Sequence, residues 1–416
     1  MKKIVLFGAV LLALGGLAAC GNGGGTQESA TSGKEQVTLW GSWSGDQIDQ
    51  LNKQIENYNQ SQEKYEVTYV MQEQVEEKML TGLAGGELPD VVLWDRYQTA
   101  LYASKGALQS VDELVEKDQV ALDDFYSEAV KEMTYEDQLY GLPLLVDTRV
   151  IFYNKDLMGE EPVPTTWDQM IEVAPKLTKR ENGKLTQAGF SLEDVGLFNM
   201  YALQAGLSLI SEKDNTIQFD NEQGKSVLDF WDTLQNKEKV YDRGFDDSGN
   251  QFAAGKLAMY YNGPWALADL DKIDGLNYGV SLPLAGPDGD VGSIMGGFGL
   301  VIPKNAANQE GAWDFMKWWT TQPENGVEFA KISGWLPANK TAAKDDYFLN
   351  NEYYSVFVEA MDNAKTRPTA TGYSTVEDLA FKPQLENFMS GKSTAADVLK
   401  AIDEEGNRIL EENQEK

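Results

Sequence analysis

An aromatic ring and a helix start meet in the middle of the chain. The apolar run Leu257 to Tyr261 predicts a short buried strand, Asn262-Gly263 predicts a turn, and Pro264 is favoured at the first position of a helix. Trp265 would then lie at the carboxyl end of a strand, where open α/β sheets bind ligands, beside the free N–H groups of the helix start. A flat apolar ring next to such donors suits a sugar, because a sugar presents both C–H faces and hydroxyls. This stretch alone leaves open the alternative that Trp265 only packs its helix onto the sheet.

Two further tryptophans follow predicted strands near the start of the chain. Trp43 comes after the predicted strand 37–40, and Trp94 ends the predicted strand 91–94. Both would lie at the same carboxyl edge of a sheet. Two aromatic residues delivered to one edge exceed what chance burial predicts, so Trp43 and Trp94 are candidate ligand contacts.

An acid interrupts an apolar run between these segments. The run Tyr140 to Leu157 reads as an apolar strand that crosses between lobes, yet Asp147 interrupts it. Burying a carboxylate costs free energy unless a partner is present. Asp147 is therefore predicted either to accept hydrogen bonds from a ligand or to form an ion pair with Arg149, which lies on the same face if the strand is regular.

The composition excludes several kinds of catalysis. The chain has no histidine and a single cysteine, which rules out Ser-His-Asp and Cys-His catalysis, zinc sites and an internal disulfide. Gly391-Lys392-Ser393 lacks the upstream glycine of a phosphate-binding loop, because Glu386 occupies that place. A glycosidase built on two carboxylates remains chemically possible. We expect a protein that is not an enzyme, with no cofactor and no metal.

The elements that must position these residues form repeated β-α-β units. A predicted strand at 37–40, a helix with an apolar stripe from Ile48 to Tyr58, a strand at 65–71, a helix from Val75 and the strand 91–94 imply a mostly parallel sheet. The roughly 400 residues after the leader exceed one comfortable core, so two lobes are expected. The net charge of −31 argues against nucleic acid and anionic lipid as partners.

The first residues read as an export signal. A basic start at Lys2-Lys3 is followed by an apolar run and by Leu17-Ala18-Ala19-Cys20, so residues 1–19 are predicted to be a signal peptide. Leu17-Ala18-Ala19-Cys20 resembles the bacterial lipobox, which implies that Cys20 carries a lipid and becomes the new N-terminus. Residues 20–35, rich in Gly, Ser and Thr, are predicted to be a flexible tether.

The turn around Trp265 also carries a family resemblance. Asn262-Gly263-Pro264-Trp265, continued by residues 276–284, resembles the corresponding region of maltose/maltodextrin-binding proteins, in the family 1 extracellular solute-binding proteins of ABC importers. In that family this tryptophan lies in the sugar site. The resemblance covers the chain from about Val37 to the last helix.

The loop after Trp94 resembles the same family, in which it grips sugar hydroxyls. Carried over by position, the resemblance implies ligand contacts from Trp94, Asp95 and Tyr97. The family's Asp-Arg pair is missing, because Tyr97 and Gln98 occupy those two places. We expect Arg96 and Gln98 to form a solvated helix start.

The resemblance implies further site residues in other segments. In the family an acid at the position of Asp147 accepts hydrogen bonds from the ligand, and a Gly-Gly loop at Gly296-Gly297 brings bare backbone to the sugar, which fits the conformational freedom of glycine. An aromatic residue near Tyr373 packs against the sugar, although Tyr373 could equally belong to a surface loop. Arg367, Asp194 and Asn199 are weaker candidates.

The resulting expectation is a two-lobed α/β binding protein of the periplasmic-binding-protein-like fold, whose lobes are joined by a multi-crossing hinge. Lobe 1 would comprise residues 36–146 and 285–335, and lobe 2 residues 147–284 and 336–416. Such a protein would be a monomer, lipid-anchored to the outer face of the bacterial cell membrane. It would close around a di- or oligosaccharide and present it to the permease subunits of an ABC importer. A glycerol 3-phosphate binder of the same family, a secreted adhesin and a glycosidase are the alternatives.

Overall fold

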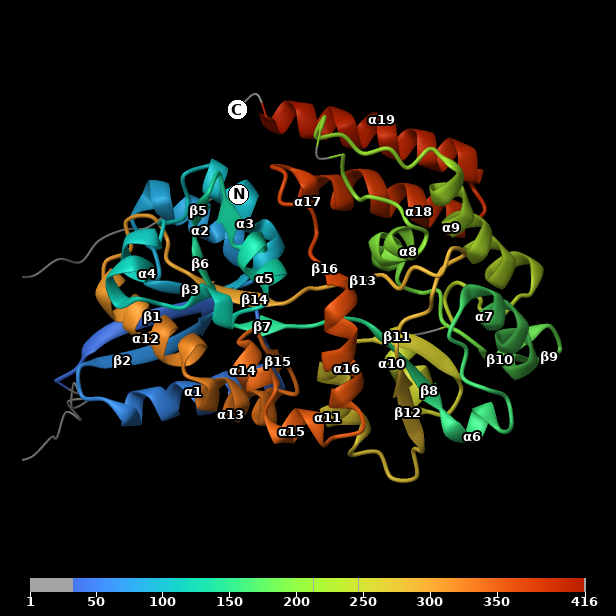
Figure 1. Cartoon of the computed structure of the whole chain (residues 1–416), viewed down its shortest axis with the longest axis horizontal. Coiled ribbons are helices and arrows are strands. Elements are labelled where there is room, and N and C mark those ends of the chain that lie inside the picture. Colours follow the sequence, from blue (N-terminus) through green and yellow to red (C-terminus); the bar gives the residue numbers. More distant parts are fainter. Residues whose placement is uncertain (1–32, 212, 246, 415–416) are drawn as a thin grey trace, which may run out of the picture.

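The computed structural model describes residues 33–414 except 212 and 246. Within this range the chain forms two lobes of mixed α/β structure, which lie side by side and are joined by crossing segments (Figure 1). Each lobe has a hydrophobic core of its own. The predicted signal peptide, Cys20 and most of the predicted tether lie outside the described residues.

The first lobe is built on a five-stranded sheet with the order β2-β1-β3-β14-β6. Its strands are β1 (Glu35–Gly41), β2 (Tyr65–Met71), β3 (Val91–Asp95), β6 (Gly141–Pro143) and β14 (Phe298–Val301). β1 runs parallel to β2 and β3, whereas β14 runs antiparallel to β3 and β6. The two predicted β-α-β units are confirmed, and a late segment of the chain completes the sheet.

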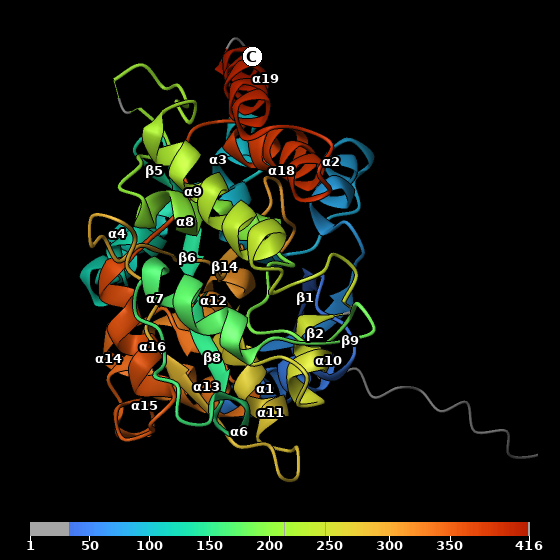
Figure 2. The ribbon, with the colours of Figure 1, turned by 90° about the vertical axis from the view of Figure 1, so that its right-hand side faces the viewer.

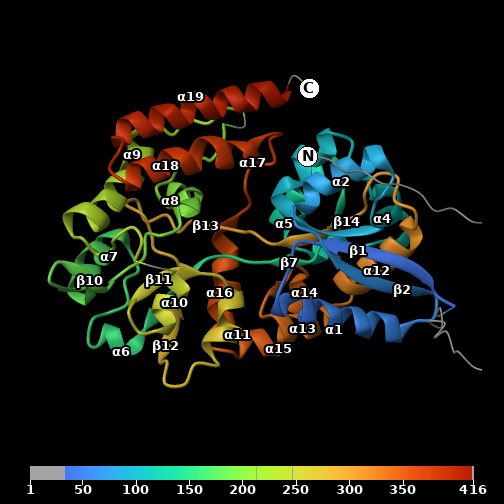
Figure 3. The ribbon, with the colours of Figure 1, turned by 180° about the vertical axis from the view of Figure 1, so that it is seen from behind.

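Helices cover both faces of this sheet. α1 (Asp46–Ser61) buries Leu51, Ile55 and Tyr58, which form the stripe of 3.6-residue period that the sequence predicts. α1 lies with α12 (Gln309–Thr321) and α13 (Pro323–Ser333) on one side of the sheet, and α2 (Val75–Gly85) and α3 (Thr99–Ser104) lie on the other (Figures 1 and 3). The lobe also contains α4 (Asp112–Asp118) and α5 (Ser127–Glu132).

The second lobe contains a three-stranded sheet in the order β11-β8-β12. Its strands are β8 (Val150–Asn154), β11 (Met259–Asn262) and β12 (Tyr278–Ser281). The two-lobed α/β fold is as predicted, but β8 runs antiparallel to both neighbours rather than in the mostly parallel arrangement expected for this lobe. The reason is that β8 enters the lobe along a crossing segment and runs against the strands that return to the interface.

Helices surround this sheet, and Figure 2 shows them from the side of the second lobe. They include α7 (Trp167–Val173), α8 (Phe198–Gln204), α9 (Glu222–Asp232), α10 (Ser248–Ala253), α16 (Tyr354–Ala360), α17 (Tyr373–Val376), α18 (Lys382–Met389) and α19 (Ala395–Gln414). Asp403 of α19 accepts the backbone N–H groups of Phe219 and Asp220 at 2.7 and 2.9 Å, which fastens this helix to the lobe. None of the helices within the described residues combines the length and apolar composition that a membrane span needs.

The crossing segments between the lobes pair with one another. β7 (Leu145–Val146) runs antiparallel to β15 (Leu336–Pro337), and β13 (Ser293–Ile294) runs parallel to β16 (Ala364–Lys365). Asp147 and Gly296 exchange two backbone hydrogen bonds of 3.1 and 3.0 Å. The first two crossings therefore run side by side, in agreement with the predicted multi-crossing connection.

Candidate functional site

A row of aromatic rings runs from the first lobe to the second. Trp43 stacks on Trp335 with ring centroids 5.7 Å apart, and Trp335 lies 4.8 Å from Trp265 at a tilt of 33°. Phe298, at the start of β14, meets Trp43 and Trp335 edge-on at 5.3 and 5.5 Å. Trp265 packs against the cores of both lobes. The structure thus links Trp43 to Trp265 through Trp335, a residue that sequence reasoning missed. Trp43 itself is 3% exposed and is stacked between Trp335 and Phe329 in the core of the first lobe, so of the three tryptophans in this row only Trp265 is partly exposed.

Local sequence explains how Trp265 reaches this row. β11 ends at Asn262, and Pro264 begins a short 3-10 helix, Pro264–Ala266, that leads into α11 (Leu267–Leu270), so the predicted turn and helix start are confirmed. A Cβ atom at Gly263 would lie 2.1 Å from the Trp265 ring, so only glycine lets the indole fold back over the turn. The position of Trp335 could also have been noticed in the sequence, because this tryptophan lies next to a strand, directly before β15.

Asp147 and Arg149 form an ion pair at the second-lobe end of this row. The Arg149 Nη1 donates to Asp147 Oδ1 at 2.5 Å. The guanidinium also lies over the Trp265 ring, 4.5 Å from its centroid. The ion pair that the sequence left open as the alternative to a ligand contact is therefore present, and the carboxylate is placed beside the aromatic row.

Arg96 is not part of a solvated helix start, which corrects the sequence-based expectation. Its side chain is completely buried and donates to Glu132 at 3.1 Å, to Gly296 O at 2.6 Å and to Phe298 O at 3.2 Å. It also donates to the carbonyl oxygen of Leu145. Burial raises the pKa of Glu132 to about 7, although Arg96 opposes this shift. The guanidinium thereby ties β7 to the segment that leads into β14.

Gly297 lies against this buried arginine. Its φ is +125°, and a Cβ atom would lie 2.2 Å from Leu145 O and 2.8 Å from Arg96 Nη1. The close approach of these crossing segments therefore requires glycine at this position. The atoms that a larger residue would meet at this position are the Leu145 carbonyl oxygen and the Arg96 guanidinium.

Trp94 lies apart from the aromatic row. Its ring is completely buried in the core of the first lobe and meets Tyr102 edge-on at 5.1 Å. The indole N–H has no hydrogen-bond partner within the described part of the chain. Because side chains alternate along β3, Trp94 points into the core. This position differs from the ligand-facing one that the sequence suggested.

A second group of side chains gathers around Arg367. Its Nε donates to both Glu377 oxygens, at 2.9 and 3.1 Å, and its guanidinium lies 5.0 Å from the Tyr97 ring centroid. Burial raises the pKa of Asp95 to about 7, and the charges of Arg367 and Arg96 oppose that shift. Asp95 and Tyr97 of the first lobe thus face Arg367 across the interface.

Tyr373 supports this group from within the second lobe. Its ring is buried, and its hydroxyl donates to Asn199 Oδ1 at 3.2 Å. The Asn199 amide in turn donates to Glu377. The predicted candidates Tyr373, Asn199 and Arg367 therefore belong to one hydrogen-bonded cluster, in which Tyr373 is a buried support.

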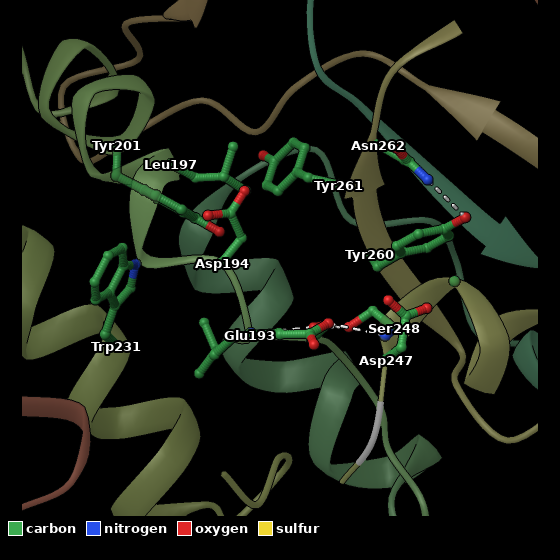
Figure 4. A pocket seen from close by; sticks show the side chains of 13 residues that line it. Glu193, Asp194, Leu197, Tyr201, Trp231, Asp247, Ser248, Tyr260, Tyr261 and Asn262 are labelled. Atoms are coloured by element: carbon green, nitrogen blue, oxygen red, sulfur yellow. Dashed lines mark hydrogen bonds between the residues drawn. The ribbon is translucent and has the colours of Figure 1, made fainter. Parts of the chain in front are cut away.

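A cavity of about 180 Å³ opens beside the end of β11 (Figure 4). Asp194, another predicted candidate, lines it and caps the following 3-10 turn by accepting the Gly196 N–H at 2.8 Å. Glu193 accepts the Ser248 N–H at 2.8 Å on the facing wall. Trp231 turns its indole nitrogen toward the cavity, and this buried N–H has no partner within the described residues. The lining offers acceptors and one unused donor to a small polar group.

Three arginines at the interface are each paired with an acid. Arg96 pairs with Glu132, Arg149 with Asp147 and Arg367 with Glu377. Phosphate recognition relies on Arg or Lys side chains that are free to bind the anion. In residues 33–414, without 212 and 246, no group of three or more acidic, His or Cys side chains is arranged to hold a metal. The arrangement suits an uncharged ligand with apolar faces and hydroxyls.

Comparison with known proteins points to one family. The family model described as bacterial extracellular solute-binding protein matches residues 53–353. The maltodextrin-binding protein MdxE of Bacillus subtilis is 26% identical over 420 residues, covering 97% of both chains. A maltooligosaccharide ABC transporter solute-binding lipoprotein of Streptococcus pneumoniae is 25% identical over 426 residues, covering 95% of this chain and 94% of that protein.

A solved structure has the same fold. The GacH receptor of Streptomyces glaucescens, determined unliganded and in complex with acarbose, aligns with a TM-score of 0.81 at 24% identity. The alignment covers 91% of this chain and 99% of the receptor. The two-lobed architecture is therefore shared over nearly the whole folded body.

Proposed function

Because this chain belongs to the bacterial extracellular solute-binding proteins, we propose that it captures a di- or oligosaccharide between its two lobes and delivers it to the permease of an ABC importer. The observation that carries the proposal is Trp265, a half-buried indole that packs on Trp335 and so joins the buried Trp43–Trp335 pair of the first lobe to the second lobe. Indole faces suit the C–H faces of sugar rings. The names of the relatives, which refer to maltodextrins and maltooligosaccharides, agree with this chemistry.

Polar contacts to the sugar would come from the groups next to the row. Asp147 and Asp95 are acceptors for hydroxyls, and Tyr97 offers both a ring and a hydroxyl. The backbone at Gly297 and the hydrogen-bonded cluster of Tyr373, Asn199 and Arg367 border the same interface between the lobes. Trp94 would act indirectly, by packing the loop that carries Asp95 and Tyr97. The pairing of these three arginines with acids favours a neutral saccharide over glycerol 3-phosphate.

The mechanism would be closure of one lobe on the other. We assign residues 36–146 and 285–335 to lobe 1, and residues 147–284 and 336–416 to lobe 2. A saccharide that contacts both lobes stabilises the closed arrangement, because some of its contacts exist only when the lobes meet. The permease would recognise this closed form. No catalytic step is required.

The N-terminal segment would anchor the protein. Lipidation of Cys20 after removal of residues 1–19 would attach it to the outer face of the cell membrane, with residues 20–35 as the tether. The presence of a lipoprotein among the relatives supports this part of the proposal. The binding unit would act as a monomer.

Isothermal titration calorimetry tests the proposal directly. The mature protein is titrated with maltodextrins, mannose-type, fructose-type and raffinose-type oligosaccharides, and glycerol 3-phosphate. We expect one-to-one binding of one class of neutral oligosaccharide and no sugar released on prolonged incubation. Binding of glycerol 3-phosphate alone, or release of reducing sugar, would refute the proposed function.

A further inference from the structure

Arg149 occupies two contacts that a bound saccharide would need. Its guanidinium donates to Asp147 at 2.5 Å and lies 4.5 Å from the centroid of the Trp265 ring. A guanidinium is flat, carries several N–H donors and stacks on aromatic rings. It therefore makes the same two interactions, ring stacking and donation to the carboxylate, that a sugar ring with its hydroxyls would make.

The side chain is free enough to leave. It is about one quarter exposed, and within the described residues the guanidinium donates a hydrogen bond to Asp147 alone. Arg96 provides the contrast, because that guanidinium is completely buried and bonds to Glu132 and to three backbone carbonyl groups. One arginine is fixed between the crossing segments, and the other is held by a single ion pair and a stacked ring.

We propose that Arg149 is a built-in placeholder, which fills the Asp147–Trp265 contact in the unliganded protein and is displaced when the saccharide binds. The inference rests on the proposed function and adds a residue that sets its affinity and selectivity. A ligand must offer both an apolar face and a hydroxyl to replace what the guanidinium supplies. A small polyol without a ring face would replace only the ion-pair half of the contact.

Displacement has a thermodynamic consequence that can be measured. If the contact is free of Arg149 in only about a tenth of the molecules, the apparent affinity is about tenfold weaker than that of an unobstructed site. Replacing Arg149 with Ala should therefore tighten saccharide binding by about tenfold. The same change removes the partner of Asp147, which is 5% exposed, so the unliganded variant should melt at a lower temperature.

Tighter saccharide binding together with a lower melting temperature would distinguish a placeholder from a residue that contacts the ligand or only stabilises the fold. Calorimetry and thermal melting are carried out on Arg149→Ala, on Arg149→Lys and on Arg180→Ala in the full mature chain. Lys keeps a charge for Asp147 but lacks the flat stacking group, so we expect intermediate affinity. Arg180 is the matched control, because it is similarly exposed and pairs with Asp242 away from the aromatic row. Its loss should lower the melting temperature without changing affinity.

A spectroscopic measurement adds a test that needs no ligand. The indole N–H signal of Trp265, assigned with Trp265→Phe, should shift in unliganded Arg149→Ala and stay in place in Arg180→Ala.

Tighter binding by Arg149→Ala with a lower melting temperature supports the placeholder, and so does binding by this variant when the wild type binds none of the sugars. Equal or weaker binding by Arg149→Ala than by the wild type would overturn it while leaving the proposed function intact. An unmoved Trp265 signal would also overturn it. If neither protein binds any saccharide, both the proposed function and this inference fail.

Discussion

Replacing Arg96 with Met would test how the crossing segments are held together. Met preserves most of the aliphatic stem and removes every donor. Glu132, which is 2% exposed, would lose its ion-pair partner, and one of its oxygens already has no hydrogen bond within the described residues. The carbonyl groups of Leu145, Gly296 and Phe298 would each lose one donor.

The expected loss of stability follows from these contacts. Removing one partner of a buried ion pair costs about 3–5 kcal/mol, because the remaining charge is left without compensation. The carbonyl groups contribute less, since Gly296 O still accepts Asp147 N–H and Phe298 O still accepts Leu144 N–H. We expect Arg96→Met to lower the free energy of unfolding by about 4 kcal/mol at pH 8.

The pH dependence of the same variant has a definite sign. Burial raises the pKa of Glu132 to about 7 in the folded wild type, from an ordinary value of 4.5. The folded protein therefore holds an extra proton between these values, and this group's contribution to stability falls as the pH rises from about 4.5 to 7. Without Arg96 the charged carboxylate is still less favourable, so the loss caused by Arg96→Met should be smaller at pH 6 than at pH 8.

Urea unfolding followed by circular dichroism at both pH values measures these quantities. The double variant Arg96→Met, Glu132→Met should recover at least half of the loss, because neither charge is then buried alone. Arg408→Met on the exposed face of α19 is the control and should change stability by less than about 0.5 kcal/mol. A loss below about 1 kcal/mol for Arg96→Met, or no recovery in the double variant, would refute the reasoning.

Three further predictions concern the interface. Trp265→Ala should weaken binding of the best saccharide by more than tenfold, measured by calorimetry, because it removes the ring that joins the row to the second lobe; unchanged affinity would place the sugar elsewhere. Gly297→Ala should lower the free energy of unfolding by at least about 2 kcal/mol, since its Cβ atom would lie 2.2 Å from a carbonyl oxygen, whereas Gly183→Ala, with open space around it, should cost about 1 kcal/mol. Asp95→Asn should reduce the fall in stability between about pH 4 and pH 7, because burial raises the pKa of Asp95 to about 7; an unchanged slope in urea titrations would contradict that origin.

The parts of the structure that follow from short stretches of sequence were predictable. Asn262-Gly263-Pro264 marks a turn and a helix start through backbone preferences that need no distant partner, and the structure places Trp265 as those residues imply. The stripe on α1 and the boundaries of β2 likewise follow from local apolar periodicity. The two-lobed fold could be inferred from the repeated units and the chain length.

Features that depend on distant partners were not predictable in the same way. Arg96 follows a strand and precedes a tyrosine, which reads as a polar loop, but its acceptors lie 36 to 202 positions away in the chain. The stacking of Trp335 on Trp43 likewise joins segments from opposite ends of the first lobe. The direction of β8 depends on which lobe the chain comes from, and an apolar run carries no information about that.

The position of β14 has a consequence for how the protein is made. This strand lies between β3 and β6, yet the chain must pass through most of the second lobe before residues 298–301 are synthesised. Until then the facing edges of β3 and β6 stay unpaired, and exposed edges of this kind recruit other strands. A nascent chain that stops short of β14 is therefore unable to complete the sheet of its first lobe.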